Sequence, residues 1–163
     1  MKVLVAVFIT VVTFGSLGCK KNSLPSPLPN NNEFNATVVL SSGQILNINA
    51  RGTKAPMGLS SPLGGASYVD GTNEAGNAVY INVFPIISGP GTFDFASGFR
   101  CQYRVNAGSG ATPIYENNGA NAGSITFTSA NAQKMEGSFN AVCRFGTDSV
   151  LVTGTFKGDR IGQ

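Results

Sequence analysis

The sequence has no histidine and no tryptophan among its 163 residues. Without histidine there is no Ser-His-Asp or Cys-His catalysis, no histidine-ligated zinc and no imidazole acid–base chemistry. Without tryptophan no sugar can stack on an indole ring, although Tyr80, Tyr115 and Phe84 remain as smaller aromatic surfaces. These absences exclude several common catalytic arrangements, and we expect a protein that is not an enzyme.

Charged residues are also scarce, at 12% of the chain, where about a quarter is usual. The net charge is +3, and no basic cluster follows Lys20-Lys21, so we expect no nucleic-acid partner. A hydrolase that uses paired carboxylates stays open as an alternative. Its pair would come from Asp70, Glu74, Asp94, Glu116, Glu136, Asp148 or Asp159.

Residues 1–18 have the pattern of a secretory leader. Lys2 is followed by an apolar run over residues 3–14, which is shorter than the ~20 residues that span a bilayer. The sequence Leu17-Gly18-Cys19 resembles the cleavage site of bacterial lipoproteins, where the cysteine sulfur receives a diacylglycerol. We therefore predict a signal peptide over residues 1–18 and lipidation of Cys19. An ordinary secretory peptide with a chance cysteine is the alternative.

Residues 19–33 are predicted to be the lipidated cysteine and a flexible linker. The segment KKNSLPSPLPNNN is rich in proline and asparagine and cannot form a packed element. About a dozen extended residues reach roughly 40 Å, at ~3.1 Å each. We therefore expect a domain over residues 34–163 that is anchored to the outer membrane of a Gram-negative bacterium, on its periplasmic or surface face.

From residue 34 onward the chain alternates between apolar and polar residues in short stretches, as half-buried β-strands do. The clearest region, residues 123–156, predicts three strands with a turn at Gly146-Thr147-Asp148. Shorter strands are predicted over residues 34–40, 44–51, 66–70, 78–84, 92–96, 99–105 and 113–116. Residues 52–65 have no periodicity and predict a loop, with Arg51, Lys54 and Met57 as its contact-prone residues.

We predict an all-β fold, a single antiparallel β-sandwich, with a closed calycin-like barrel as the alternative. No stretch has a helical apolar period of useful length. Burying one phenylalanine contributes roughly 1.5–3 kcal/mol, so the phenylalanine-rich face should form the core. The predicted core residues are Phe93, Phe95, Phe139, Cys143, Phe145, Val150, Val152 and Phe156. Gly137 and Gly154, inside strand patterns, indicate a bulge or a close backbone approach.

Three segments of the C-terminal half carry a family resemblance: GSITFT at residues 123–128, EGSF at 136–139 and VTGTF at 152–156. They resemble small bacterial lipoproteins of unassigned function, whose pattern is Gly-x-Ile-Thr-Ile-Thr, Gly-Thr-Phe and Thr-x-Gly-x-Phe. Phe127 stands where isoleucine is common in that pattern. The resemblance extends more weakly through residues 78–95 and the leader. It implies a fold and a location in the cell envelope, and it implies no activity.

Cys101 and Cys143 fall on the inward faces of their predicted strands. In an oxidising compartment such a pair can form a disulfide. Closing a loop of about 42 residues would contribute roughly 4 kcal/mol in the chain-entropy model. Two buried free thiols are the alternative. With Cys19 assigned to lipid, the remaining cysteines are too few for a structural zinc site.

The only acidic cluster, DGTNEAGN at residues 70–77, has oxygen ligands of the kind that bind calcium. Its residues lack the order of a calcium loop, so a polar hairpin turn is favoured. We expect no cofactor and no metal.

The sequence thus predicts an envelope-anchored, non-enzymatic binding or structural module. It meets the membrane through its lipid, and its protein or glycan partner is not specified. One alternative is a carrier of small apolar ligands, if the strands close around a cavity; the other is the carboxylate hydrolase. A solvent-open cavity lined by Phe93, Phe95, Phe139 and Phe156 would favour the carrier, and a filled interior would favour the binding module.

Overall fold

The computed structural model describes residues 31–60, 65–84, 86–110, 112–119 and 121–160, so the predicted leader and Cys19 lie outside the described residues. The strands are β1 (Glu33–Val39), β2 (Ile45–Arg51), β3 (Met57–Ser60), β4 (Ala66–Thr72), β5 (Ala78–Val83), β6 (Gly91–Asp94), β7 (Phe99–Arg104), β8 (Ile114–Glu116), β9 (Gly123–Ala130), β10 (Lys134–Phe145) and β11 (Asp148–Asp159). A three-residue 3-10 helix, η1 (Gly52–Lys54), is the only helix in the described ranges. The predicted all-β class is confirmed.

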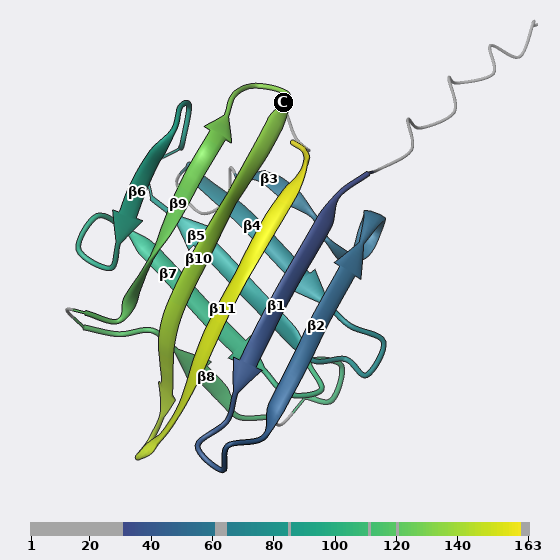
Figure 1. Ribbon diagram of the computed structural model, residues 1–163, viewed down its shortest axis with the longest axis vertical. Helices are drawn as coiled ribbons and strands as arrows, with labels where there is room; N and C mark the ends of the chain where they lie inside the picture. The colour runs from purple at the N-terminus through teal and green to yellow at the C-terminus, as the bar shows by residue number, and fades with distance from the viewer. Residues whose placement is uncertain (1–30, 61–64, 85, 111, 120, 161–163) are drawn as a thin grey trace, which may run out of the picture.

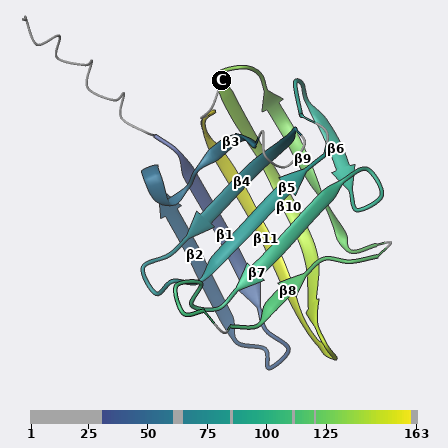
Figure 2. The ribbon, with the colours of Figure 1, turned by 180° about the vertical axis from the view of Figure 1, so that it is seen from behind.

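All the strands belong to one antiparallel sheet that folds over on itself. Its order is β2-β1-β11-β10-β8-β7-β5-β4-β3, with β9 also paired to β10 and β6 to β9. Strands β2, β1, β11, β10, β9 and β6 form a front layer, and β8, β7, β5, β4 and β3 form a back layer that crosses behind it (Figure 1). The reverse view shows the back layer uncovered (Figure 2). The result is a half-barrel with two facing layers, because β2 and β3 end the sheet without a recorded pairing to each other.

The long hairpin of β10 and β11 is the centre of the front layer. Both strands have twelve residues, and β10 alternates buried and exposed positions almost throughout. Gly146 in the connecting turn has φ +59, a left-handed conformation that glycine adopts at little cost. Strand β1 lies on the other side of β11, so the first and last strands of the domain are neighbours.

The core between the layers is filled by aromatic rings. Phe34 of β1 and Phe139 of β10 stack with their centroids 5.5 Å apart, and Phe127 and Phe156 meet edge to face at 5.3 Å. The Phe34 ring also lies against Gly71 of β4, where any added Cβ atom would overlap it. Because β1 and β4 belong to different layers, this contact sets how closely the layers approach each other.

The prediction that Gly137 and Gly154 mark a bulge or a close approach of neighbouring groups is confirmed. A Cβ atom at Gly137 would lie 2.7 Å from Cζ of Phe156, and one at Gly154 would lie 2.6 Å from Cζ of Phe139. The pairing of β9 with β10 also shifts register between Glu136 and Gly137, which is a β-bulge. Each glycine therefore makes room for a core ring in the neighbouring strand.

Most of the predicted core is confirmed, since Phe139, Cys143, Val150, Val152 and Phe156 are buried. The prediction for Phe145 is wrong: its side chain is 52% exposed at the end of β10, where its ring rests on Tyr115. Phe93 is partly buried and packs against the core. Phe95 follows the end of β6 and is also partly buried, and the guanidinium of Arg100 lies 3.9 Å from its ring centroid.

Two segments that the sequence predicts to be irregular take part in the core. Met57 begins β3 and is fully buried, so it is a core residue and not a contact-prone loop residue. Asn32, assigned to the linker, is 1% exposed. Its Nδ2 donates to the carbonyl of Ala55 at 2.9 Å, and its Oδ1 accepts from the backbone N–H of Asp159 at 2.6 Å. The folded domain therefore includes Asn32 and β1 from Glu33 onward.

Candidate functional site

The outward face of the front layer is turned toward the viewer in Figure 1. The strand register places two parallel rows of small polar side chains on this face. One row contains Asn49, Asn35, Thr155, Ser138, Thr126 and Thr92, which pair across β2, β1, β11, β10, β9 and β6. The other contains Asn47, Thr37, Thr153, Asn140, Ser124 and Asp94 on the same strands. We call these two rows the polar array. Every member except Asp94 is an uncharged asparagine, serine or threonine.

Neighbouring side chains of the polar array hold one another in place at its borders. Thr37 Oγ1 bonds Asn47 Oδ1 at 3.3 Å, the Thr92 and Thr126 hydroxyls are 2.9 Å apart, and Asn140 Nδ2 donates to Ser124 Oγ at 3.4 Å. At the centre, the hydroxyls of Thr153, Thr155 and Ser138 have no side-chain hydrogen bond to any described residue. These central groups are therefore available to a ligand.

A row of charged residues borders the array on one side. Arg51, Glu33, Lys157 and Glu136 pair in this order across β2, β1, β11 and β10, so their charges alternate in sign. Arg51 Nη1 lies 3.4 Å from Glu33 Oε1. Each positive residue in the row neighbours a negative one, so the charges of the row balance.

A hollow of about 370 Å³ opens between the charged row and the polar array. Its walls come from both rows and from β9, and they are formed by Glu33, Asn35, Thr128, Glu136, Gly137, Ser138, Thr155, Phe156 and Lys157. A second hollow of about 370 Å³ lies next to it at the strand ends and shares Glu136 and Lys157. Both are partly open, and the core residues Phe156 and Met135 are among their lining residues.

On its other side the array is bordered by an apolar row. Ile45, Val39, Leu151 and Val142 pair across β2, β1, β11 and β10. Ile45 is 61% exposed and Leu151 is 44% exposed. The neutral polar surface therefore ends at a charged border on one side and at an apolar border on the other.

The aromatic surfaces expected from the sequence are largely occupied by neighbouring groups. Tyr80 on the outward face of β5 has the guanidinium of Arg104 5.0 Å from its ring centroid. Tyr115 packs between Tyr103 and Phe145, and its hydroxyl donates to Asp148 Oδ2 at 2.8 Å. Phe84 is 37% exposed beyond the end of β5. A stacking platform made of several rings is therefore not assembled among the described residues.

The structure separates the candidate catalytic carboxylates. The recorded partners are the Ile81 N–H for Asp70, Lys54 for Glu74, Ser97 for Asp94, Gln102 for Glu116 and Tyr115 for Asp148. Glu136 lies in the charged row, and Asp159 ends β11. Burial raises the pKa of Asp70 to about 7, which makes it the most perturbed carboxyl of the seven. No described interaction joins any two of these carboxylates.

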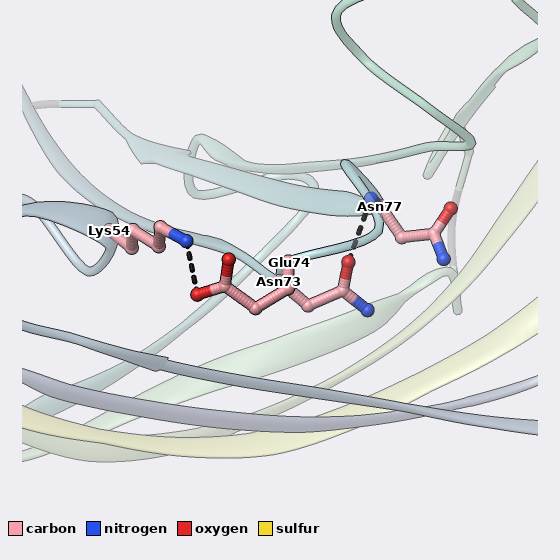
Figure 3. A network of polar contacts seen from close by, with 4 residues as sticks. All are labelled: Lys54, Asn73, Glu74 and Asn77. Carbon is pink, nitrogen blue, oxygen red and sulfur yellow. Dashed lines mark hydrogen bonds and ion pairs between the residues drawn. The ribbon is translucent and has the colours of Figure 1, made fainter.

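The acidic segment at residues 70–77 forms the turn between β4 and β5. Asp70 lies in β4, while Glu74 is in the turn and pairs with Lys54 (Figure 3). Asn73 Oδ1 accepts a hydrogen bond from the Asn77 backbone N–H at 2.9 Å, which closes the turn. Within the described part of the chain, no group of three or more potential metal ligands comes together. The arrangement is that of a polar hairpin turn, with Glu74 and Asn73 both bonded within the protein.

Cys101 and Cys143 lie side by side as buried free thiols. Cys143 Sγ donates to the carbonyl oxygen of Cys101 at 3.6 Å. The neighbouring Cys143 and burial both raise the pKa of Cys101 well above its usual range. The structure thus brings the two predicted partners together, and the disulfide itself stays a prediction.

No protein-family model matches the chain, and neither a curated protein nor a solved structure matches it. No helix in the described ranges is long and apolar enough to cross a membrane. The polar array and its hollow are therefore identified from geometry and chemistry alone.

Proposed function

We propose that the chain is a lipid-tethered, non-enzymatic binding module of the bacterial cell envelope. The observation that supports this is the contrast between a filled interior and a depression on the outward face of the front layer. The space between the layers contains packed rings, whereas the hollow of about 370 Å³ is lined by seven polar or charged residues together with Gly137 and Phe156. A ligand would therefore meet the surface of the sheet and not its inside.

The carrier alternative has little support from this interior. Phe139 and Phe156, which would line a cavity for an apolar ligand, are 4% and 2% exposed. Their rings reach so close to Gly154 and Gly137 that even a methyl group would not fit. An apolar ligand would need these rings to move apart, which costs packing energy throughout the core.

The hydrolase alternative has equally little support. The two carboxylates of a glycosidase must face each other across the scissile bond. Here Asp70 lies on the outward face of the back layer, whereas Glu136 lies on the outward face of the front layer. A single perturbed carboxyl such as Asp70 has no described acidic partner with which to share the reaction.

The envelope location follows from the leader and from Cys19. Several acyl chains on one cysteine hold a protein on a membrane, since each buried CH₂ contributes about 0.8 kcal/mol. The domain then needs no membrane-binding surface of its own. The first described residues, Asn31 and Asn32, belong to the C-terminal end of the predicted linker, and Asn32 bonds to Asp159, the last residue of β11, so the linker meets the domain where β1 begins and β11 ends.

The test is fractionation of cells that express the full chain or its Cys19→Ala variant. The unchanged chain should sediment with membranes and have the mass of bound lipid, and Cys19→Ala should be soluble and lack that mass. Lys20→Ala, a neighbouring change that removes no acylation site, should behave as the unchanged chain. A Cys19→Ala variant that still sediments with membranes at the same mass as the unchanged chain would contradict the tether.

A further inference from the structure

We infer that the polar array binds a neutral polysaccharide chain. The inference rests on the proposed binding function and names the class of ligand. It is drawn from the chemistry of one outward sheet face, which six strands assemble from segments far apart in the sequence.

The first reason to infer a neutral ligand is that the polar array contains almost no charged residues. Outward sheet faces usually contain lysine and glutamate, and about a quarter of residues in an average domain are charged. In the polar array the only charged residue is Asp94, at the β6 border, where its carboxylate accepts hydrogen bonds from Ser97. A neutral surface suits a neutral ligand, because no ionic group has to lose its water when the ligand binds.

The same composition disfavours other macromolecules. Nucleic acids and anionic lipids need clustered lysine or arginine, and the nearest cations, Arg51 and Lys157, neighbour Glu33 in the charged row. Protein interfaces are enriched in aromatic residues, methionine and arginine, and are depleted in serine. None of these interface-enriched residues occurs in the array, so hydroxyls and amides of a ligand are the groups that it matches.

The geometry adds a further argument. Strands lie about 4.7–4.9 Å apart, so six of them extend over roughly 24 Å from first to last. Side-chain amides and hydroxyls both donate and accept hydrogen bonds, as the hydroxyls of a sugar do. The cross-strand bonds at the array's borders hold its side chains in place, while Thr153, Thr155 and Ser138 remain open at its centre.

Sedimentation with insoluble matrices tests the inference. The purified protein is mixed with cellulose, chitin, starch or mannan as neutral matrices and with heparin-agarose as an anionic one. We expect depletion from solution by at least one neutral matrix, equal at roughly 50 and 500 mM salt because no counterions are released. The double variant Thr153→Val/Thr155→Val, which keeps strand shape but removes two central hydroxyls, should bind at least tenfold more weakly.

Thr72→Val is the matched control, because Thr72 lies in β4 of the back layer, outside the array. It should bind as the unchanged protein does. Thermal melts verify that each variant is folded, and Ser138→Ala replaces the double variant if the latter is not. The inference is overturned by retention on none of the neutral matrices, by binding to heparin alone that salt abolishes, or by equal binding of the array variant and Thr72→Val. Fractionation of Cys19→Ala tests the lipid tether in a separate experiment. The tether and the binding of a polysaccharide can therefore fail independently of each other.

Discussion

The ring of Phe34 occupies the place where a side chain at position 71 would have to lie, so Gly71 in the back layer and Phe34 in the front layer fit together. Phe34 is completely buried and stacks on Phe139 in its own layer. The absence of a side chain at Gly71 is therefore what allows the two layers to close over this ring.

Gly71→Ala should lower the free energy of unfolding by about 1–3 kcal/mol, the usual cost of adding a methyl group to a packed core. Gly89→Ala is the control, since nothing lies within 4 Å of its added Cβ and its φ is not positive. Urea unfolding of both variants measures the difference. Phe34→Leu should cost less in the Gly71→Ala background than alone, and additive effects of the two changes would contradict the proposed fit.

Tyr103, which is buried, and Tyr115, which is partly buried, should respond in opposite ways to loss of the hydroxyl. The Tyr103 side chain is fully buried, and its hydroxyl has no hydrogen-bond partner among the described residues. An unsatisfied buried group costs about 1–3 kcal/mol, so Tyr103→Phe should be neutral or stabilising. Tyr115→Phe loses the bond to Asp148 and should destabilise by about 0.5–1.5 kcal/mol. Chemical denaturation measures both, and a strongly destabilised Tyr103→Phe variant would mean that its hydroxyl has a partner.

Asp70 should make stability depend on pH. Its ordinary pKa is 3.8 and burial raises it to about 7 in the folded state. The folded state therefore retains a proton that the unfolded chain releases. The stabilisation from that proton is complete below about pH 4 and is lost as the pH rises through about 7.

The asparagine side chain of Asp70→Asn is uncharged at every pH and can still accept a hydrogen bond from the Ile81 backbone N–H. This variant should therefore not lose stability as the pH rises. At pH 8 its free energy of unfolding should exceed that of the unchanged protein by about 2–4 kcal/mol. Near pH 4 the two should be equal. Thermal melts over this range provide the measurement, with the exposed Glu116→Gln as control. If stability changes with pH by the same amount in the unchanged protein and in Asp70→Asn, Asp70 is not the cause of the pH dependence.

The prediction that Cys101 and Cys143 form a disulfide is tested by intact-mass measurement after alkylation in denaturant without reductant. Both residues should escape alkylation, and both should react once a reductant is added. Reduction should also lower the free energy of unfolding by roughly 4 kcal/mol. Alkylation of both residues in the unreduced protein would instead establish the buried thiols as the native state.

Alternation along the chain is enough to predict most strands, but not where the covering layer ends. Phe145 continues the inward series of β10, yet it is the last residue of the strand and is 52% exposed. Val105 is a second residue that the alternation places on the inward face but that is not buried. Strand β7 ends at Arg104, and Val105 is 38% exposed. A period of two specifies a face, whereas burial also depends on how far the opposite layer extends.

The composition of residues 52–65 leads to the opposite error, because it predicts a loop where part of the segment is a strand with a buried residue. Glycine, proline and serine predict a loop, and yet Met57 in β3 is fully buried. Edge strands such as β3 need only one partner, here β4, so a short irregular sequence can still pair. Pairing with β4, the next strand in the chain, supplies a structure that local composition does not indicate.

The polar array could not be predicted from the sequence for a related reason. The outward positions of each strand are readable, including Thr126 and Thr155. Their alignment into rows depends on register, such as Asn35 opposite Thr155, between strands more than a hundred residues apart. No local signal specifies that register, so only the three-dimensional structure brings these side chains together.

The pairing of β1 with β11 has a consequence for the order of events during synthesis. A ribosome releases Glu33–Val39 long before Asp148–Asp159, so β1 and β2 must wait as an isolated hairpin, which is marginally stable in water. Contacts between such distant segments also make folding slow. The sheet therefore cannot be completed until its last strand, β11, has left the ribosome.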